Sequence, residues 1–332
     1  MAQAFVTGAT GFVGANLVRL LLAQGHQVRV LVRPQSSLRN LQGLPVERVT
    51  GDVLSPELPH HLAGCDVLFH VAAHYSLWQR DKDLLYQANV LGTRHILQAA
   101  HTAGVPRTVY TSSVAAIGVG KPGQVVDETH QSPVASLIGH YKQSKYWAEQ
   151  EAHQAAQRGQ DVVIVNPTTP IGAWDSKPTP TGDIILRFLR GQMPAYVNTG
   201  LNFIPVQDVA WGHILAWQKG QSGRRYILGH TNLSLQAFLQ KLAQITGLAA
   251  PGWQIPVQIP LAVAWVDEIL LGTLGKKPSL ALDSVRMAHQ TMYYDSQRAI
   301  RELGLPQTDL DEAIKQAVDW FRQQGMVGCR NS

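Results

Sequence analysis

Short apolar runs alternate with segments of helical periodicity through the first half of the chain. Residues 4–7 and 27–32 form compact apolar runs, and residues 12–24 between them repeat apolar side chains at helical spacing. The alternation predicts further strands at 46–49, 66–73, 107–113 and 161–165, and a long helix at 84–103. Strands and helices that alternate at these lengths predict an α/β fold with a doubly wound parallel (Rossmann) sheet.

The pattern becomes irregular beyond residue 166. Prolines at 167, 170, 178, 180 and 194 favour loops and short helices that close over a ligand, rather than another sheet layer. Residues 203–210 are typical of a return to the sheet, 224–228 would be its final strand, and helices are expected at 235–245, 261–274, 279–289, 296–303 and 310–323. We therefore expect a first domain of residues 1–165, to which 201–230 return. A smaller, mainly helical substrate domain would comprise residues 166–200 and 231–332.

A glycine-rich turn joins the first strand to the first helix. It reads Thr7-Gly8-Ala9-Thr10-Gly11-Phe12-Val13-Gly14, with glycines at three-residue spacing. Such glycines permit a tight turn, let backbone N–H groups approach a pyrophosphate, and allow the helix to pack closely on the strand. The positive end of the helix dipole then lies beneath the phosphates. The turn predicts that the first domain binds a dinucleotide, with a glycine-rich turn without ligand as the alternative.

The end of the second strand distinguishes the two nicotinamide dinucleotides. NAD sites usually place a carboxylate there to bind the ribose 2′-hydroxyl. Here the strand ends at Val32-Arg33-Pro34, and no acidic residue follows before Glu47. An arginine can pair with the 2′-phosphate of NADP. Arg33 therefore favours NADP over NAD; the alternative is that it is an ordinary surface residue.

Tyr141 and Lys145 lie four positions apart in a segment expected to be helical, so their side chains share one face. A phenol, with a pKa of roughly 10, is a poor acid near neutrality until a nearby ammonium stabilises its phenolate. Tyr141 is therefore a candidate for exchanging a proton with a carbonyl or alcohol oxygen. A tyrosine and a lysine at this spacing also occur by chance. The pair therefore indicates a catalytic site only in combination with the glycine turn and the strand ends that precede it.

Composition argues against several other classes of protein. The 332 residues are 45% hydrophobic and 15% charged, contain two cysteines, and show no signal peptide, so we expect a soluble cytoplasmic protein. The most apolar stretch, 255–274, contains two prolines and two acidic residues, which oppose a transmembrane segment and favour an amphipathic helix over a pocket. The formal charge of +5 comes from scattered residues without an aromatic stacking platform, so no nucleic-acid partner is expected. The 13 histidines show no metal-ligand spacing, so no metal is expected.

Five motifs in this order resemble the extended short-chain dehydrogenase/reductase family. They are Thr7-Gly8-x-x-Gly11-x-x-Gly14, Gly51-Asp52-Val53, Asn89-Val90-x-Gly92-Thr93, Thr111-Ser112-Ser113 and Tyr141-x-x-x-Lys145. The resemblance runs from residue 1 to about 230 and recurs near residues 295–304. Within the family, the chain resembles the dihydroflavonol reductase-like carbonyl reductases and, more closely, the group of hopanoid-associated sugar epimerases. Membership would imply a small-molecule substrate and a homodimer.

The resemblance also implies roles for individual residues. Tyr141 would be the general acid/base, Lys145 would lower its pKa and hold the nicotinamide ribose, and Ser113 would hydrogen-bond the substrate oxygen. Asn89 would support a proton path, or would only hydrogen-bond the backbone. The residues expected to contact the cofactor are Thr7, Gly8, Thr10, Gly11, Phe12, Val13, Gly14, Arg33, Asp52, Val53, Ala72, Tyr141, Lys145 and Pro167.

Six further residues are candidates for the substrate pocket, although ordinary packing explains each of them at least as well. They are His74, Tyr75, Trp78, Trp174, Tyr196 and Asn202.

Three functions are compatible with these residues. The favoured one is an NADP-dependent oxidoreductase that moves hydride between the nicotinamide and a carbonyl or secondary alcohol of a small, largely apolar substrate. The second is a nucleotide-sugar epimerase or dehydratase that keeps NAD tightly bound. The third is a non-enzymatic sensor that only binds the dinucleotide.

Overall fold

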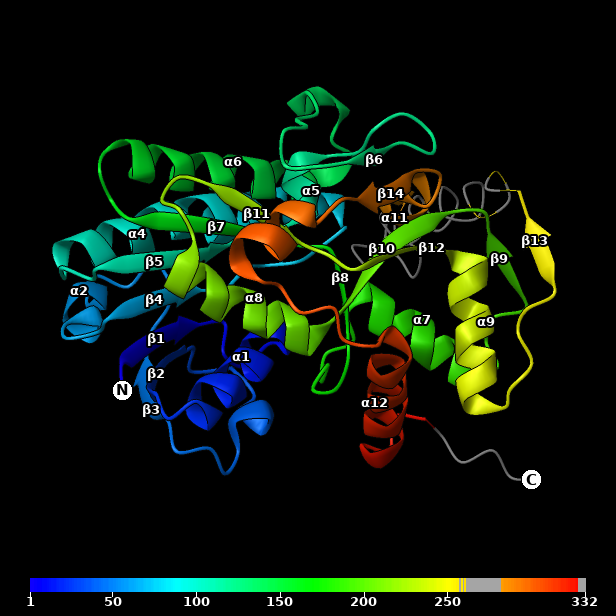
Figure 1. Ribbon diagram of the computed structural model, residues 1–332, viewed down its shortest axis with the longest axis horizontal. Coiled ribbons are helices and arrows are strands. Elements are labelled where there is room, and N and C mark those ends of the chain that lie inside the picture. The colour runs from blue at the N-terminus through cyan, green and yellow to red at the C-terminus, as the bar shows by residue number, and fades with distance from the viewer. Residues whose placement is uncertain (257, 259, 261–281, 328–332) are drawn as a thin grey trace.

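The computed structural model describes residues 1–256, 258, 260 and 282–327, and its largest element is a seven-stranded sheet (Figure 1). The strand order is β11-β7-β5-β4-β1-β2-β3, and every neighbouring pair is parallel. The strands are β1 (Gln3–Thr7), β2 (Gln27–Val32), β3 (Glu47–Thr50), β4 (Val67–His70), β5 (Arg107–Thr111), β7 (Val162–Pro167) and β11 (Arg225–Leu228). The predicted doubly wound parallel sheet is therefore confirmed. The chain order reverses between β1 and β4, which is where such sheets bind their ligands.

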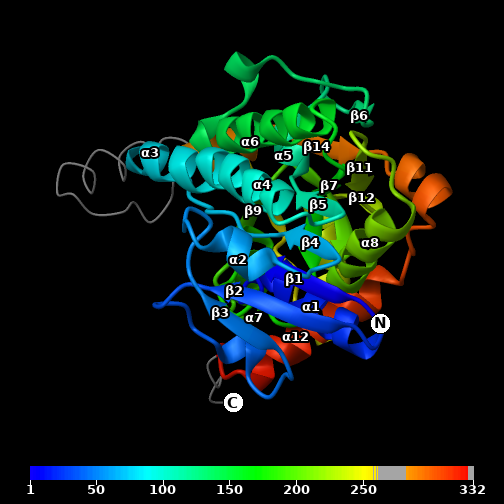
Figure 2. The same cartoon turned by 90° about the vertical axis from the view of Figure 1, so that its left-hand side faces the viewer.

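Helices cover both faces of this sheet (Figure 2). One face packs against α1 (Phe12–Ala23) and α8 (Val206–Lys219), and the other against α2 (Leu58–Leu62), α4 (Gly92–Thr102) and α6 (Gly139–Gln157). The long helix expected at 84–103 is divided into α3 (Lys82–Leu85), a π-helical stretch at Tyr86–Leu91, and α4. A short helix, α5 (Val114–Ile117), follows β5 directly.

A second sheet lies beside the first, so the prediction that no further sheet layer follows residue 166 is wrong. Its order is β12 (Thr231–Ser234), β10 (Gly200–Pro205), β14 (Thr291–Tyr294) and β6 (Val125–Val126), and β8 (Thr169–Ile171) also pairs with β10. A further pair joins β9 (Ala195–Val197) to β13 (Trp253–Ile255). Pro170 is compatible with a strand because β8 pairs on one side only, where a missing N–H is tolerated. Residues 201–230 were expected to return to the first sheet. In the structure, β10 joins the second sheet, α8 packs against the first sheet, and β11 is a strand of it.

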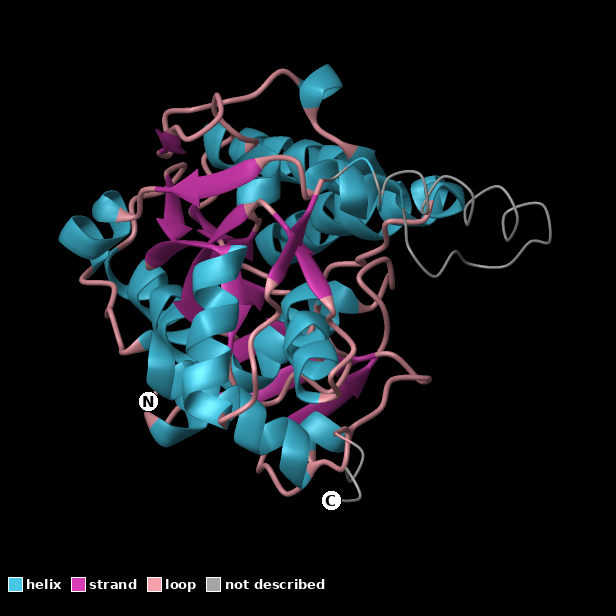
Figure 3. Cartoon of the chain, turned by 90° about the vertical axis from the view of Figure 1, so that its right-hand side faces the viewer, coloured by secondary structure: helices cyan, strands magenta, loops and turns pink. Residues whose placement is uncertain are grey.

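The second half of the chain has its own apolar core, and Figure 3 shows the helices and strands on this side of the molecule. It is built from α7 (Pro180–Leu189), α9 (Leu235–Thr246), α12 (Leu310–Gln323) and β10, with the rings of Phe203 and Phe238 stacked at its centre. The helices expected at 235–245 and 310–323 are present. Of the helix expected at 279–289, the described part is α11 (Leu282–Met287), which ends two residues early, and that expected at 296–303 is a π-helical turn, Ala299–Leu303.

The amphipathic helix expected at 261–274 lies outside the described residues. The division into a dinucleotide domain and a substrate domain stays a prediction. Within the described ranges, no helix is long and apolar enough to cross a membrane.

Candidate active site

The glycine turn after β1 leaves no room for side chains at two of its glycines. Gly8 has φ +71°, and a Cβ there would lie 2.6 Å from the backbone nitrogen of Ala72 at the end of the neighbouring β4. A Cβ at Gly14 would lie 2.2 Å from the carbonyl oxygen of Gly8. The turn is thus pressed against Ala72 and against the first turn of α1, which is the close approach expected from the sequence.

The start of α1 fits a dinucleotide pyrophosphate. Gly11 is its N-cap, no side chain caps the helix, and no acidic residue lies in its first turn. The first backbone N–H groups of a helix have no intrahelical acceptors, and together with the helix dipole they favour an anion. Thr10, Phe12 and Val13 surround this point, and Asn40 ties it to a distant loop by donating to the carbonyls of Thr10 and Trp174, both at 3.1 Å.

A buried chain of hydrogen bonds supports the floor of the site beneath Ala72. The Thr7 hydroxyl accepts from the Ala72 N–H at 3.1 Å and shares a 2.8 Å hydrogen bond with His70. The other ring nitrogen of His70 lies 3.2 Å from the Thr93 hydroxyl. Burial, and secondarily the charge of Lys145, lowers the pKa of His70 to about 3. His70 is therefore a neutral structural residue that holds the ends of β1 and β4 together.

The residues expected at the adenosine end lie at the same edge of the sheet. Arg33 directly follows β2 and is exposed. The Asp52 carboxylate follows β3 and accepts from the Leu54 N–H at 3.3 Å. Val53 is buried and packs against Gly92, where an added Cβ would lie 2.7 Å from the valine side chain. The residue at the end of β2 is therefore an arginine and not a carboxylate.

Tyr141 and Lys145 lie in the first two turns of α6, as the spacing predicts. The Lys145 ammonium is buried, donates to the Thr111 carbonyl at 2.9 Å, and lies 3.4 Å from the Tyr110 hydroxyl. Burial lowers the pKa of Lys145 to about 8, an effect that the Glu149 carboxylate partly offsets. Burial raises the pKa of Tyr141 to about 12, and the nearby Ser113 hydroxyl lowers it in part. The structure thus brings Ser113, Tyr141 and Lys145 together at the end of β5.

Ser113 is fixed from both sides. It is the N-cap of α5, and its Oγ accepts from the Ala115 N–H at 3.1 Å. Its carbonyl oxygen accepts a hydrogen bond from the Asn166 side chain at 3.0 Å. Asn166 directly precedes Pro167 at the buried end of β7. Because Oγ accepts from the backbone, the hydroxyl hydrogen can be donated either to the Tyr141 oxygen or to a substrate oxygen.

Asn89 connects the loop after β4 to α6. Its side chain accepts from the His74 N–H at 2.7 Å and donates to the His74 carbonyl and the Ser144 hydroxyl, both at 2.9 Å. It lies in the π-helical stretch, where the helical hydrogen-bond ladder is interrupted. These contacts give Asn89 a positioning role and leave its predicted part in a proton path as a prediction.

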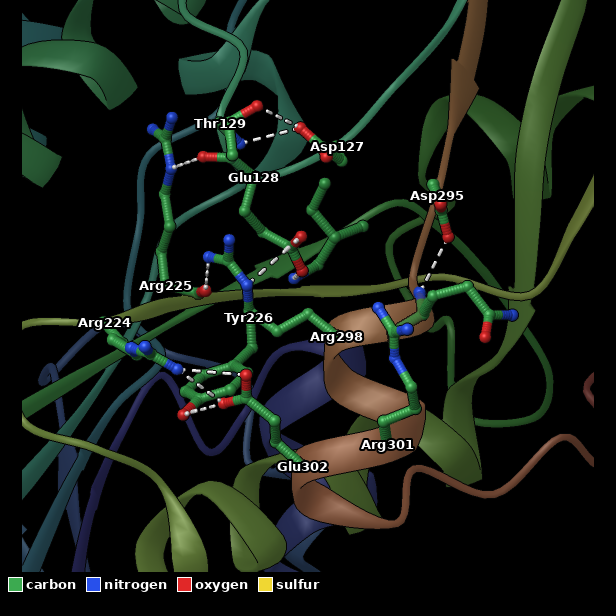
Figure 4. A network of polar contacts seen from close by, with 12 residues as sticks. Asp127, Glu128, Thr129, Arg224, Arg225, Tyr226, Asp295, Arg298, Arg301 and Glu302 are labelled. Atoms are coloured by element: carbon green, nitrogen blue, oxygen red, sulfur yellow. Dashed lines mark hydrogen bonds and ion pairs between the residues drawn. The ribbon is translucent and has the colours of Figure 1, made fainter.

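A buried ion-pair network behind Ser113 was not predicted from the sequence. Glu149 accepts from Asn166 at 2.6 Å and from Arg225 at 2.8 Å. Although burial alone would raise it, the pKa of Glu149 is held at about 2 by His153 and Arg225. Arg225 also donates to the Glu128 carbonyl at 2.9 Å, and Figure 4 shows this arginine between Glu128 and the Arg298 side chain. The one visible sign in the sequence is that Glu149 follows Lys145 by four positions, on the same helical face.

Of the six substrate-pocket candidates, Tyr75 contacts Tyr141. The ring of Tyr75 packs edge-on against that of Tyr141, with 4.7 Å between centroids. His74 precedes it in the same loop and is tied to Asn89, and Trp78 packs beneath the Arg80 guanidinium at 5.8 Å. The loop after β4 therefore reaches Tyr141 through Tyr75, and the part of these three residues in a substrate pocket stays a prediction.

The other three candidates lie elsewhere among the described residues. Trp174 packs under the Arg19 guanidinium, 3.4 Å from its ring centroid, and has φ +76°. Tyr196 is buried in the core of the second half. Asn202 is buried in β10, where it bonds to Asn232 at 2.8 Å and to the Tyr294 carbonyl at 3.2 Å. These contacts explain the three residues by packing, the alternative recognised from the sequence. The described residues contain no group of three or more histidine, cysteine or acidic side chains that could hold a metal.

Comparison with known proteins identifies the family. Residues 4–229 match the NAD dependent epimerase/dehydratase family. The chain is 62% identical over 327 residues to a Synechocystis sp. protein with the provisional name dihydroflavonol 4-reductase, covering 97% of this chain and 95% of the relative. It is 38% identical to sterol demethylase protein B of Methylococcus capsulatus, covering 97% and 99% of the two chains. A solved structure of a nucleoside-diphosphate-sugar epimerase from Pseudomonas aeruginosa superimposes with a TM-score of 0.82 at 27% identity, covering 98% and 99%.

The glycine turn, the Ser113–Tyr141–Lys145 cluster and these similarities agree with one another. The chain belongs to the NAD-dependent epimerase/dehydratase family of extended short-chain dehydrogenases/reductases and is an NAD(P)-dependent oxidoreductase.

Proposed function

We propose that this protein is an NADP-dependent carbonyl reductase in which Tyr141 is the general acid. The observation that carries the proposal is the grouping of Tyr141, Lys145 and Ser113 at the carboxyl edge of the sheet. Lys145 contacts the Thr111 carbonyl two residues before Ser113, so one helix and one strand end hold all three groups.

The residues divide the reaction between them. The cofactor, when bound, supplies hydride to the carbonyl carbon. Tyr141 donates its phenolic proton to the carbonyl oxygen, and the Ser113 hydroxyl hydrogen stabilises the charge that develops there. The Lys145 ammonium stabilises the phenolate that Tyr141 becomes. Tyr75, packed on the Tyr141 ring, keeps water from one side of the phenol.

The proposed NADP preference rests on Arg33. It is exposed at the end of β2, next to the strand that carries the glycine turn, and can pair with a 2′-phosphate. Arg33→Ala should raise KM for NADPH about ten- to a hundredfold, the range expected for a charged hydrogen bond, and should leave KM for NADH nearly unchanged. Arg48→Ala, which removes an exposed arginine from the neighbouring β3, is the matched control.

The acid role is tested by following NADPH oxidation with a panel of aldehydes and ketones. Tyr141→Phe should lower kcat by about 10²–10⁴ and leave the Kd for NADPH within about threefold. Turnover of Tyr141→Phe close to that of the unchanged protein would reject the assignment.

A sugar-nucleotide epimerase with tightly bound NAD is the second candidate. The family name and the similarity to the Pseudomonas epimerase structure favour it. Denaturing the purified protein and identifying any released dinucleotide separates the two. Retained NAD in near-equimolar amount supports the epimerase, and exchange with added NADPH supports the reductase.

A further inference from the structure

Lys142 is an exception among the buried charged residues of this protein. The described lysine and carboxylate side chains at most 8% exposed are Glu128, Lys142, Lys145, Glu149, Glu151, Asp175, Asp208 and Asp283. Seven of them have a hydrogen bond or ion pair. Lys142 is 5% exposed, and no described group pairs with it. A buried ammonium without a partner is costly, so its retention calls for an explanation.

The position of Lys142 places it beside the proposed reaction centre. It lies three positions before Lys145 and seven before Glu149, so these three residues share one side of α6. Tyr141 directly precedes Lys142, about 100° around the helix, and is the neighbour of Lys145 on that side. This side of α6 faces the Ser113 turn. Lys145 contacts the Thr111 carbonyl, two residues before Ser113, and Glu149 accepts from Asn166, which also donates to the Ser113 carbonyl. The Lys142 stem therefore leaves α6 toward the Ser113 turn and the short α5.

The ammonium end of Lys142 is open to a ligand. The described side-chain atoms that are sealed from solvent and lack a hydrogen-bond partner do not include Lys142 Nζ. A nitrogen that has no partner and is not sealed borders on space that solvent or a ligand can enter. Lys142 thus combines a buried stem with an accessible charge.

The start of α6 adds to the positive potential at this point. The helix has 19 residues, no side-chain cap and no acidic residue in its first turn. Among the described residues, the carboxylate beside Gly139 is that of Asp283 of α11, which is paired with Arg286 at 3.4 Å. The charge of Asp283 is thus offset by its own partner, and that of Lys142 remains unmatched.

We propose that Lys142 binds an anionic group, a carboxylate or a phosphate, carried by the substrate whose carbonyl Tyr141 protonates. The assignment rests on the proposed reductase function and narrows it to substrates whose negative charge lies within the reach of a lysine side chain from the reaction centre. The rest of the substrate can still be apolar, because the anion alone pairs with the lysine. Binding of the substrate would supply a counter-ion that no described residue provides.

A binding experiment tests the site without requiring turnover. Protein labelled with [ε-¹³C]lysine and saturated with NADP⁺ is titrated with benzoate, with phenyl phosphate, and with benzamide as the neutral control. The Lys142 resonance, assigned with Lys142→Arg, should shift and saturate with one or both anions and not with benzamide. The anion that saturates at lower concentration identifies the group. Absence of a saturating shift with either anion overturns the proposal, whatever the activity.

A kinetic experiment tests whether the anion belongs to the substrate. Reduction of 4-formylbenzoate is compared with that of its methyl ester, and 4-formylphenyl phosphate provides the phosphate arm. In Lys142→Met, kcat/KM for the better anion should fall about ten- to a hundredfold, whereas the ester should change less than about threefold. Lys142→Arg keeps the charge and should retain most of the preference.

The outcomes separate this proposal from the function on which it rests. Saturating anion shifts without reduction of any carbonyl by the unchanged protein would support the anion site and reject the reductase. Reduction with the same acid-to-ester ratio in the unchanged protein and in Lys142→Met would support the reductase and overturn the role of Lys142. Melting curves of Lys142→Met exclude misfolding, since removing an unpaired buried charge should not lower Tm.

Discussion

Tyr75 covers Tyr141: the two rings meet edge-on with 4.7 Å between centroids, although 43% of Tyr75 is itself exposed. The residue proposed to donate the proton is thus shielded by a side chain from a loop. Burial is the first cause of the raised pKa of Tyr141, so the acidity of the site depends partly on that loop.

Replacing Tyr75 by alanine should therefore lower the pKa of Tyr141 from about 12 toward the usual value of roughly 10. The shift can be followed by NMR of protein labelled with [ζ-¹³C]tyrosine, with Tyr141→Phe to assign the signal. Tyr75→Phe keeps the ring and should leave the Tyr141 pKa unchanged. If Tyr75→Ala leaves it unchanged too, Tyr75 does not shield the phenol.

The reduction rate should decline on the alkaline side of neutrality. Lys145 has a pKa of about 8 and is charged below it, whereas Tyr141, at about 12, keeps its proton throughout. The groups that face Lys145 are Tyr110, Glu149, Tyr141 and the neutral His70. As pH rises through about 8, the ammonium is lost and no longer stabilises the Tyr141 phenolate. We expect kcat/KM for reduction to be flat below about pH 7 and to fall about tenfold per pH unit above 9. A profile flat to pH 10 would contradict this role of Lys145.

Glu149→Gln should move that decline to lower pH. The Glu149 carboxylate raises the pKa of Lys145, so its neutral replacement should lower the lysine pKa further. Breaking the buried pair with Arg225 should also lower the free energy of unfolding by about 3–5 kcal/mol. Glu151→Gln is the matched control, because Glu151 is buried in the same helix but pairs with Arg94 of α4 at 2.7 Å. The control should lose stability without a shift in the pH profile; equal profiles in both variants would make Glu149 purely structural.

Asp175 should make the protein less stable as pH rises from 4 to 7. Burial raises its pKa to about 6, against a usual value of 3.8, despite hydrogen bonds from Thr179. Between these values the folded protein holds a proton that the unfolded chain releases, so stability falls with increasing pH. The full loss is on the order of 3 kcal/mol. Urea unfolding at several pH values should show that Asp175→Asn removes most of this slope. Asp183→Asn, at a half-buried position of α7 where the carboxylate pairs with Arg187, should not.

The parts of the site that lie close in sequence could be predicted, because local spacing determines them. Gly8 and Gly14 were expected to allow close backbone packing, and Ala72 and the Gly8 carbonyl do leave no room for a Cβ. Tyr141 and Lys145 share a helical face, as a spacing of four requires. Their chemical roles are untested and stay predictions.

The second sheet could not be predicted, because its strands carry little periodic signal. β6 has two residues, β8 has three, and β10 pairs with β14 from a distant part of the chain. The network behind Ser113 was missed for a similar reason. Asn166 and Arg225 approach Glu149 from 17 and 76 positions away, and only the folded chain brings them together.

The long sequence separation between Glu149 and Arg225 affects how the protein folds during synthesis. Arg225 lies 76 positions after Glu149, and Arg298, which contacts the Arg225 carbonyl, lies a further 73 positions on. A nascent chain that has emerged only as far as β7 would have to bury Glu149 without its arginine. We therefore expect the nucleotide-binding half to close around Ser113 only after β11 has left the ribosome. A fragment that ends at residue 165 would be a substrate for chaperones and proteases, not a free-standing domain.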